Sequence, residues 1–380
     1  MIKRMVRDYI AQLISSYPAV VIVGPRGCGK TTIARTFSDL CFNIECEKDV
    51  ARLEFLWEDC MNSGKLVVLE EMHQHPELFL RLRAVLDEYQ GGNGQFLITE
   101  SFCSSMIDIL GDRSTVCSLT PLLVNELGTG QYDRLWRNGA YPEVWNSEVP
   151  LPFGQQLYLD QMIQLNLPNV GLSVLPSFTE RLFKILAALH GTIYNASRIG
   201  KSLGVSYHTI NSYVEYLVRA GLVRFLSAAR LNLRKRSVKS PKLYWRDSGL
   251  FHALVGLNSE DDLFSKPWVG ASWEGWVIEQ ICNRLEAEGE SVNACHFSTS
   301  DQYSLDLLLD FRGKRWAIDT TISSSPQPEF MVNLAKAAEL VGADHALLIS
   351  RSHKTWSSQG VVSLGLGDAL AFLLDRSEAP

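Results

Sequence analysis

The chain has 380 residues, of which 46% are hydrophobic and 21% are charged. This length favours two to four domains over one core, and the composition is ordinary for a soluble protein. No apolar run approaches the roughly 20 residues that span a bilayer, and the N-terminus has no signal-peptide pattern, so we expect a cytoplasmic protein that does not bind membranes. The eight scattered cysteines favour reduced, buried thiols over disulfides or zinc sites.

The net charge of −6 is unevenly spread along the chain. Residues 1–150 carry 14 Lys+Arg against 20 Asp+Glu, or −6, and residues 251–380 carry 9 against 18, or −9. The middle, residues 151–250, carries 13 against 4, or +9. An anionic partner would therefore bind the middle of the chain.

A phosphate-binding loop is predicted near the N-terminus. The β-branched run Val20–Val23 is typical of a buried parallel strand, and it leads into Gly24-x-x-x-x-Gly29-Lys30-Thr31. A helix is expected from Thr31 to Phe37, so the glycine turn aims its backbone N–H groups and a helix N-terminus at one point. The P-loop pattern predicts binding of ATP and Mg²⁺. Lys30 would reach the β and γ phosphates, Thr31 would ligate the metal, and the candidate nucleotide-binding residues are Gly24, Pro25, Arg26, Gly27, Cys28, Gly29, Lys30, Thr31 and Thr32.

A second acidic strand follows, as an ATPase requires. Leu66–Leu69 is predicted to be a buried strand, with Glu70 and Glu71 at its end. Ligands bind at the carboxyl ends of strands in open α/β sheets. Glu70 would contact Mg²⁺, or a water bound to it, and Glu71 would act as the general base that polarises the attacking water.

Two further candidate residues belong to this region. The strand in "GQFLITES" ends in Thr99, Glu100 and Ser101, and Thr99 is placed to sense the γ-phosphate. Arg113, just before another predicted strand, is a candidate arginine finger that would reach the nucleotide of a neighbouring subunit. This assignment implies a homo-oligomer. A surface ion pair between Arg113 and Asp112 is the alternative.

Eight segments in this order carry a resemblance: "VGPRGCGKTT", "VVLEEMHQHPELF", "FLITES", "LGDR", "LTPLLVNEL", "NGAYPEV", "KSPKLYWRDSGLFHAL" and "GASWEGWVIEQI". Together they resemble the prokaryotic AAA-type P-loop ATPases that are fused to a C-terminal domain of unassigned function. The resemblance implies an α/β protein with four parts. These are a P-loop ATPase domain with a parallel sheet at 1–120, a helical lid at 121–172, a winged helix-turn-helix at 173–250 and a restriction-nuclease-like α/β domain at 251–380.

The chain departs from the pattern of this family at three positions. Glu70 replaces the usual aspartate, Glu100 replaces a small glycine, and Thr321 replaces a lysine. A carboxylate at position 100 would repel a γ-phosphate unless Mg²⁺ or Arg113 compensates for its charge. Nucleotide binding is therefore expected, and hydrolysis is the step that these departures affect.

The basic middle contains a predicted helix-turn-helix. In "NASRIGKSLGVSYHTINSYVEYLVRAGLVRFL", Ser206 is the expected N-cap of the second helix, and Gly221 follows its end. Ile210, Tyr213, Val214 and Leu217 recur at helical spacing and would form its buried face. Its exposed face near the helix start carries the candidate DNA-contacting residues Tyr207, His208 and Asn211.

The next thirteen residues, "RLNLRKRSVKSPK", hold six positive charges and no acid. A hairpin wing that carries these charges would lie on phosphates, with Arg234, Lys235, Arg236 and Lys239 as the candidate contacts. Residues 195–242 would thus bind double-stranded DNA. The alternative is that this wing docks on an acidic neighbouring domain or on another protein.

The C-terminal part resembles a restriction-type nuclease that has lost its activity. The helix in "GASWEGWVIEQICNRLEAEGE" would bury Trp273, Trp276, Val277, Ile281 and Leu285, and two strands, "SLDLLLDF" and "RWAIDTTI", meet at a turn near Gly313. By this resemblance Glu274, Asp306 and Asp319 take the metal-binding carboxylate positions, and Thr321 takes the lysine position. Threonine has no charge, and the cations nearest in sequence, Lys314 and Arg315, are expected at the far end of the hairpin. We therefore expect a vestigial site.

Three functions remain open from the sequence. The first is an ATP-driven switch of AAA type that contacts DNA. The second is a nucleotide-gated regulatory or protein-interaction protein with little ATP turnover. The third, an active Mg²⁺-dependent nuclease, has the least support.

Overall fold

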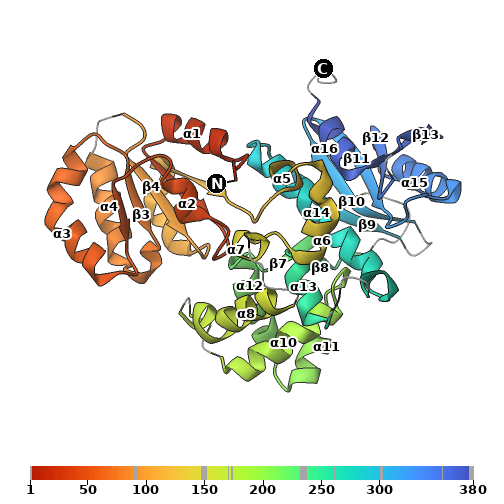
Figure 1. Cartoon of the computed structure of the whole chain (residues 1–380), viewed down its shortest axis with the longest axis horizontal. Coiled ribbons are helices and arrows are strands. Elements are labelled where there is room, and N and C mark those ends of the chain that lie inside the picture. Colours follow the sequence, from red (N-terminus) through yellow and green to blue (C-terminus); the bar gives the residue numbers. More distant parts are fainter. Residues whose placement is uncertain are drawn as a thin grey trace. The chain divides into compact units, whose positions relative to one another are not determined.

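The computed structural model describes residues 2–88, 92–146, 152–169, 171–172, 174–231, 238–257, 259, 262–299, 303–352 and 354–375. These residues form two compact units (Figure 1). The first contains residues 1–122 with 141–143 and 219–221, and the second contains 123–140, 144–218 and 222–380. Among the described residues, no helix is long and apolar enough to cross a membrane.

The first unit is built on a five-stranded parallel sheet with the strand order β2-β3-β4-β1-β5. This sheet confirms the predicted P-loop NTPase fold class. The strands are β1 (Ala19–Val23), β2 (Cys41–Asn43), β3 (Val67–Glu70), β4 (Phe96–Glu100) and β5 (Ser114–Ser118). The helices are α1 (Arg7–Ser16), α2 (Lys30–Ala34), α3 (Glu47–Asn62), η1 (Met72–Gln74), α4 (Glu77–Glu88) and η2 (Ser105–Arg113).

One face of this sheet carries the main core of the unit. Leu53 of α3 and Phe79 and Leu82 of α4 pack against alternate strand residues, such as Val21 and Ile98. Figure 1 shows α1 and α2 on the other side of the sheet from α3 and α4. Because both faces are covered, the strands are apolar on both sides, which is why they read as continuous hydrophobic runs in the sequence.

Two expected boundaries differ in the structure. The helix after the phosphate loop ends at Ala34 rather than Phe37. The hydroxyl of Thr36 donates to the carbonyl of Ile33 at 2.7 Å, a local bond that competes with continuation of the helix. The strand predicted at Leu66–Leu69 runs instead from Val67 to Glu70, so Glu70 is its last residue.

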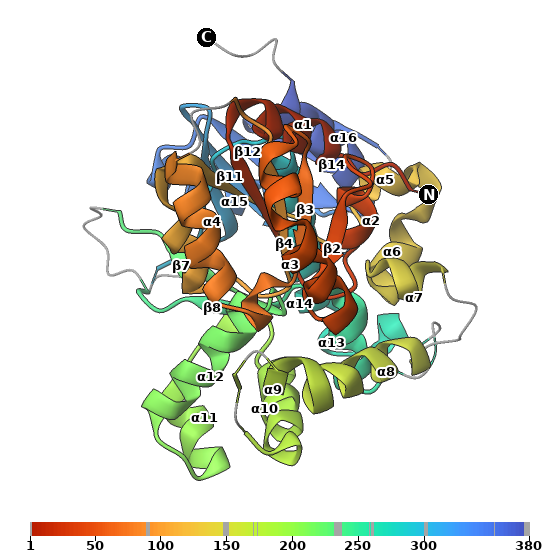
Figure 2. The ribbon, with the colours of Figure 1, turned by 90° about the vertical axis from the view of Figure 1, so that its left-hand side faces the viewer.

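The second unit begins with short helices and a helix-turn-helix. They are α5 (Val124–Leu127), η3 (Thr129–Gln131), α6 (Tyr132–Asn138), α7 (Pro142–Asn146), whose first two residues belong to the first unit, α8 (Phe153–Gln161), η4 (Met162–Asn166), α9 (Leu167–Asn169), α10 (Pro176–Ala188), α11 (Ala196–Leu203) and α12 (Tyr207–Arg219). Figure 2 shows α10 beside α11 and α12. Most of the predicted helical lid thus belongs to the second unit. The four expected domain boundaries remain predictions.

The rest of the second unit contains a nine-stranded sheet with the order β13-β14-β12-β11-β10-β9-β7-β8-β6. Its strands are β6 (Thr192–Ile193), β7 (Val223–Ala228), β8 (Lys242–Trp245), β9 (Asn293–Ser298), β10 (Ser304–Phe311), β11 (Lys314–Thr320), β12 (His345–Ser350), β13 (Trp356–Ser358) and β14 (Val361–Gly365). The accompanying helices are α13 (Ser248–Leu254), η5 (Leu263–Ser265), α14 (Val269–Ala287), α15 (Pro328–Val341) and α16 (Leu366–Leu374).

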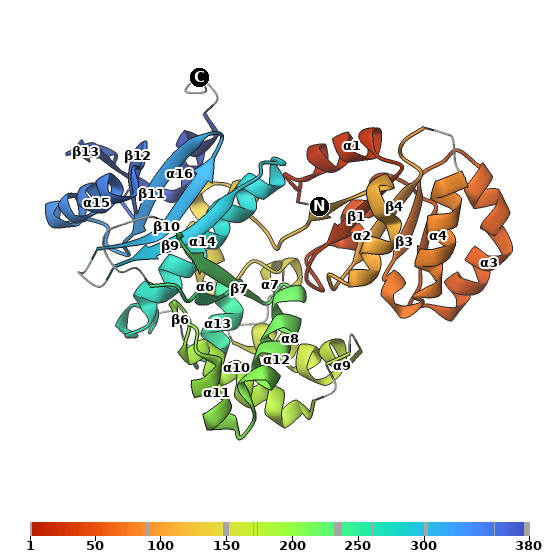
Figure 3. The ribbon, with the colours of Figure 1, turned by 180° about the vertical axis from the view of Figure 1, so that it is seen from behind.

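Both faces of the C-terminal strands are covered by helices. Met331 and Leu334 of α15 pack on Leu308, Ala317 and Leu348. Figure 3 shows α14 on the opposite side of these strands from α15. The side chains of α14 predicted to face inward are all buried: Trp273, Trp276, Val277, Ile281 and Leu285.

Three histidines are buried in the described part of the second unit, and His190 and His252 are the two whose pKa is lowered most. His190 stacks on Phe251 with ring centroids 4.2 Å apart and accepts the backbone N–H of Trp245 at 3.0 Å. Burial lowers the pKa of His190 to about 3. Burial also lowers the pKa of His252 to about 4, and this ring lies 2.7 Å from the hydroxyl of Ser272. Protonation of either ring in the folded protein is therefore unfavourable.

These histidines predict acid sensitivity. Because the unfolded chain binds their protons near the ordinary pKa of 6.5, the stabilisation present above that pH is lost as pH falls toward the folded pKa values. The free energy of unfolding should fall by up to about 1.4 kcal/mol per pH unit for each ring. Urea unfolding followed by tryptophan fluorescence tests this, since eight of the nine tryptophans lie in the second unit.

The informative variant is His190→Gln, which should flatten the pH dependence between pH 6.5 and 4. His208→Gln is the matched control, because His208 is exposed and should leave the slope unchanged. An unaltered slope in His190→Gln would show that burial of this ring does not govern the acid response.

Candidate functional site

The phosphate loop connects β1 to α2 through glycines that no other residue can replace without strain. Gly27 and Gly29 have φ angles of 80° and 103°, in the left-handed region that favours glycine. A Cβ atom on Gly24 would lie 2.1 Å from the carbonyl oxygen of Leu119. The loop therefore follows the ends of β1 and β5 closely, and its shape depends on these glycines.

Lys30 lies at the centre of this loop. Its Nζ donates to the carbonyl oxygens of Gly24 and Pro25 at 2.9 and 3.3 Å and to the hydroxyl of Ser101 at 2.8 Å. The side chain is only 6% exposed in a unit whose other buried charges are carboxylates. The structure thus places a buried ammonium where the sequence predicts the phosphate contact.

The other predicted loop residues differ in environment. Arg26 is exposed and forms a two-bond ion pair with Glu45, at 2.9 and 3.1 Å. The thiol of Cys28 is buried and donates to the carbonyl of Leu119 at 3.4 Å, and burial raises its pKa. Thr32 is exposed on α2. Cys28 therefore has a packing role, while Arg26 and Thr32 lie at the surface of the loop.

Sequence reasoning missed one side chain that supports the loop. Arg4 donates to the carbonyl of Cys28 at 2.7 Å and to that of Thr120 at 2.6 Å. These bonds tie the phosphate loop to the chain that follows β5. No motif predicts this role, because Arg4 lies outside the loop pattern, twenty residues before Gly24.

Thr31 and Glu70 meet as predicted for a metal site. The hydroxyl of Thr31 donates to Oε2 of Glu70 at 2.7 Å. Glu70 is 4% exposed, and its Oε1 is buried without a hydrogen-bond partner, with Nε of Arg35 3.8 Å away. A hydroxyl next to a carboxylate oxygen that lacks a donor is a set of hard oxygen ligands, which fits Mg²⁺.

Glu71 points its carboxylate toward the loop. Its backbone has a left-handed φ of 58°, held by an N–H bond to the carbonyl of Thr99 at 2.7 Å. Its side chain accepts the backbone N–H of Ser101 at 2.9 Å and also the Ser101 hydroxyl, and it lies 3.8 Å from Nζ of Lys30. Thr99, the predicted sensor, is only 1% exposed. The ends of β3 and β4 therefore bring Glu71 beside Lys30.

The unusual Glu100 is balanced by a residue that sequence reasoning missed. Glu100 is fully buried, and its Oε2 lies 2.7 Å from Nδ1 of His73. Burial raises the pKa of Glu100, and the His73 bond partly opposes that rise. Burial lowers the pKa of His73, but the bond to Glu100 and the charges of Glu100 and Glu71 outweigh this effect and raise it. His73, rather than Arg113, thus provides the compensating charge for Glu100 within the chain.

Arg113 lies at the amino-terminal end of β5, whereas the phosphate loop follows the carboxyl-terminal end of β1. It ends η2 and precedes β5, which pairs with β1 in the parallel register Ala19↔Ser114. The phosphate loop begins at the opposite end of β1. This strand has five residues that each rise roughly 3.3 Å, so the two ends of the strand lie about 15 Å apart. Arg113 therefore cannot serve the nucleotide site of its own chain, and its assignment as a finger for a neighbouring subunit stays a prediction.

The helix-turn-helix forms with the predicted capping residues. The backbone N–H of Thr209 donates to the hydroxyl of Ser206 at 3.1 Å, and Gly221 has a φ of 71° after α12 ends. Tyr207 and His208 are exposed at the start of α12, with ring centroids 3.9 Å apart. Asn211 is exposed too, but its side-chain oxygen already accepts the hydroxyl of Tyr194 at 3.0 Å.

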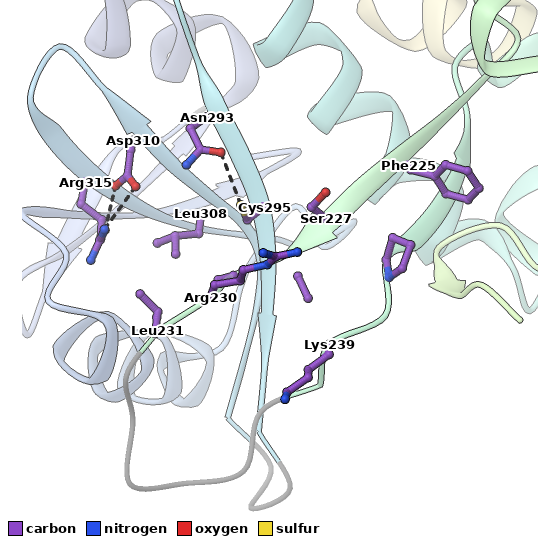
Figure 4. Close-up of a pocket in the computed structure, with 13 residues that line it drawn as sticks. Phe225, Ser227, Arg230, Leu231, Lys239, Asn293, Cys295, Leu308, Asp310 and Arg315 are labelled. Carbon is purple, nitrogen blue, oxygen red and sulfur yellow. Dashed lines mark hydrogen bonds and ion pairs between the residues drawn. The ribbon is translucent and has the colours of Figure 1, made fainter. Parts of the chain in front are cut away.

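The predicted wing is described only in part. Arg234, Lys235 and Arg236 lie outside the described residues, whereas Lys239 and Arg230 are described and exposed. Both line a cavity of about 600 Å³ beside the end of β7 (Figure 4). On another side of the cavity, Arg315 is held by Asp310 at 2.7 Å. Lys239 and Arg230 therefore present positive charge to this cavity.

The three carboxylates of the predicted vestigial site do come together. The backbone N–H of Asp306 donates to Oδ1 of Asp319 at 3.0 Å. Nζ of Lys242 donates to Oε1 of Glu274 at 2.8 Å and lies 4.0 Å from Asp306. Thr321 follows the end of β11 and brings no charge. A lysine is thus present among these carboxylates, but it comes from β8.

Lys242 had been counted with the basic wing, so its actual place was not predicted. Burial lowers its pKa, but the charges of Glu274 and Asp306 outweigh this effect and raise it. Burial, followed by repulsion from Asp306, raises the pKa of Glu274 to about 7. The same two causes raise the pKa of Asp319 well above its ordinary value. Lys242 is therefore the cation that makes this cluster of carboxylates tolerable.

Comparisons with known proteins divide the chain into three matched regions. Residues 16–128 match a family model described as an AAA domain. Residues 129–261 match a domain of unknown function (DUF8612), and residues 269–366 match another (DUF4143). Uncharacterized proteins of Mycobacterium bovis and Mycobacterium tuberculosis are each 27% identical over 388 residues, covering 97% of this chain and 87% of theirs.

Solved structures give weaker likenesses. A Walker-type ATPase of Pyrococcus abyssi has a TM-score of 0.44 at 11% identity, covering 67% of this chain and 96% of its own. A signal transduction ATPase with numerous domains from Pyrococcus horikoshii has a TM-score of 0.25 at 15% identity, and the match covers 76% of this chain and 47% of the other. A protein of Vibrio cholerae has a TM-score of 0.20 at 11% identity, and the match covers 93% of this chain and 96% of the other. All three TM-scores lie below 0.5.

The matched AAA domain covers the five-stranded parallel sheet and the phosphate loop. The N-terminal part of the chain therefore has the fold of a P-loop NTPase and is similar to the AAA domain. The two regions that follow it match domains with no assigned function.

The position of Lys242 predicts a stability effect. Lys242→Met should lower the free energy of unfolding by about 2 kcal/mol, because it leaves Glu274 and Asp306 without their cation. The loss should be smaller than for a fully buried ion pair, because the lysine side chain is 19% exposed. Urea denaturation at pH 8 measures it. Lys314→Met at the hairpin turn is the control and should change stability little. If Lys242→Met proves as stable as the wild type, the ion pair contributes no net stability.

Proposed function

We propose that the protein binds ATP and Mg²⁺ in the first unit, hydrolyses the ATP, and acts in the cytoplasm as a nucleotide-driven switch that contacts double-stranded DNA through residues 195–242. The observation that carries the nucleotide part is the buried ammonium of Lys30, enclosed by loop carbonyls, with the carboxylate of Glu71 3.8 Å away. The ammonium group can bind phosphate oxygens when they replace these acceptors, and the N–H groups of the loop can donate to the same oxygens.

Each residue near the loop has a role in this proposal. Lys30 and the backbone N–H groups of residues 24–32 would bind the phosphates. Thr31 and Glu70 would hold Mg²⁺, which supplies charge neutralisation at the phosphates. Glu71 would hold and deprotonate the attacking water, and Thr99 would contribute at the γ-phosphate. In a homo-oligomer, Arg113 would reach the site of the next subunit.

The alternative is a nucleotide-gated regulatory protein with little turnover. One observation favours it: the carboxylate of Glu71 is already occupied by both the backbone N–H and the hydroxyl of Ser101. A base held by two donors is less available to a water molecule. Glu70 adds to this, since it is one methylene longer than the usual aspartate and would alter the metal geometry.

The DNA part of the proposal is supported by charge and exposure. The start of α12 carries Tyr207 and His208 but no Lys or Arg. The exposed cations of the described residues in this region lie instead on α11, at Arg198 and Lys201, and at Arg230 and Lys239 near the cavity. Contact with phosphates is therefore better supported than base reading. Docking on a protein remains the rival, and DNA binding separates the two.

The C-terminal carboxylates support a vestigial nuclease site. Among the described residues, ligand atoms of Glu274, Asp306 and Asp319 do not form a compact metal-binding group. Lys242 instead neutralises Glu274 directly. Cleavage of DNA is therefore not part of the proposed function.

The nucleotide part predicts two different losses. Lys30→Ala should weaken ATP binding at least about 100-fold, because it removes the buried cation. Glu71→Gln should keep ATP binding but lower phosphate release about 100-fold or more, because an amide cannot accept the proton. Calorimetry with ATP and a steady-state phosphate-release assay measure the two effects.

The wild type, Lys30→Ala and Glu71→Gln also distinguish the ATPase from the regulatory alternative. Slow phosphate release by the wild type, unchanged in Glu71→Gln, would establish the regulatory alternative. ATP binding of equal strength in the wild type and Lys30→Ala would reject both the ATPase and the gated switch. Lys65→Ala serves as a surface control, since Lys65 is exposed and lies outside the phosphate loop.

The DNA part predicts a change in salt dependence. Charge reversal of Arg234, Lys235 and Arg236, or of Lys239 alone, should weaken binding of a duplex and lower the slope of log K against log salt by about one for each lost phosphate contact. Fluorescence anisotropy at several salt concentrations measures the slope. Lys65→Glu is the control, since it makes the same charge change on an exposed residue outside residues 195–242. An unchanged slope in the reversed variants would place the contact elsewhere.

A further inference from the structure

Three potential metal ligands meet at the edge of the first sheet. Glu71 follows β3, His73 lies on η1, and Glu100 ends β4. Nδ1 of His73 is 2.7 Å from Oε2 of Glu100 and 3.4 Å from Oε2 of Glu71. One ligand atom of each residue lies within 4.8 Å of the others, and no other set of three such residues does so in the described part of the chain.

Glu100 supplies a second, independent sign of a ligand. This residue has no exposed surface, yet its Oε1 has no hydrogen-bond partner. A buried carboxylate oxygen without a donor costs free energy that the single bond to His73 on the other oxygen does not remove. Lys30 lies 3.8 Å from Glu71 but is already bound to Gly24, Pro25 and Ser101, so His73 is the group that lies beside both carboxylates.

The distances from His73 to the two carboxylates are close to those in a tetrahedral metal site, and the two carboxylates lie within 4.8 Å of each other. Ligand bonds of roughly 2.0–2.1 Å at tetrahedral angles place two ligand atoms about 3.3 Å apart. The His73–Glu71 separation of 3.4 Å already matches, and the His73–Glu100 pair would open by about half an ångström. His73 and Glu71 are 11% and 13% exposed, so solvent and ions reach the group from one side.

The chemistry of the three ligands selects the kind of metal. An imidazole nitrogen with two carboxylates suits Zn²⁺ and Co²⁺, whereas Mg²⁺ prefers oxygen ligands alone. Thr31 and Glu70 form such an oxygen set. The two sites are therefore chemically distinct.

We propose that Glu71, His73 and Glu100 form a binding site for one transition-metal dication of the zinc type. Metal binding there requires no nucleotide and does not rest on ATP hydrolysis. It has a consequence for hydrolysis, however, because it uses the carboxylate of Glu71. Loading of this site withdraws that carboxylate from any water molecule and arrests turnover.

The test uses the full chain, treated with a chelator and returned to excess Mg²⁺. It is carried out in a Cys46→Ser/Cys103→Ser background, because these two exposed thiols are also zinc ligands. Calorimetry with Zn²⁺ should show one tight site, and Co²⁺ should give the visible absorption of a low-coordinate nitrogen–oxygen complex. His73→Gln and Glu100→Gln should each weaken that site at least about 100-fold.

A neighbouring pair provides the matched control. His75 lies 2.8 Å from Glu77, but both side chains are exposed, and within the described part of the chain no third ligand joins them. His75→Gln should therefore bind Zn²⁺ and Co²⁺ like the parent. Equal Zn²⁺ affinity in the parent and His73→Gln, or no site in the parent that survives excess Mg²⁺, would overturn the proposal.

A second readout follows phosphate release with stoichiometric Zn²⁺. The parent should lose its turnover, and a chelator should restore it. A parent that binds Zn²⁺ at His73 but never releases phosphate would contradict the proposed ATPase and leave the metal site standing. A parent that hydrolyses ATP at full rate with Zn²⁺ bound would overturn the inhibitory part of this inference.

Discussion

The buried ammonium of Lys30 is the interaction around which the first unit is organised. Its hydrogen bonds reach the carbonyls that follow β1 and the hydroxyl that follows β4, and its charge lies near the carboxylate that follows β3. Three strand ends that are far apart in the chain thus share one cation. Such a cation is tolerated only because carbonyls, a hydroxyl and Glu71 replace the water it lost.

This dependence explains which parts of the site could be read from the sequence. The loop glycines, Lys30, Thr31 and the two glutamates follow short buried strands, and parallel strands place their carboxyl ends at one edge. The pairing of His73 with Glu100 could not be read in this way, because His73 lies on η1 and not at a strand end. Arg4 was missed because its role depends on packing and not on a local pattern.

The second unit shows the same division between local and distant information. The helix-turn-helix, its N-cap Ser206 and the buried face of α14 follow from local periodicity and capping. The partner of Glu274 does not, since Lys242 belongs to a strand more than thirty residues earlier in the chain. The sequence pattern assigned that lysine to the basic wing. In the fold it is held between carboxylates, so the positive charge of the wing is smaller than the composition suggests.

The pairing of β7 with β9 has a mechanical consequence. Ser227 and Ala228 are in register with Cys295 and His296, so the strands behind the helix-turn-helix and the C-terminal strands share one continuous hydrogen-bonded ladder. A ladder of this kind resists bending at its seam far more than a flexible linker does. A rotation of α12 would therefore move β10 and α15 with it as one rigid body.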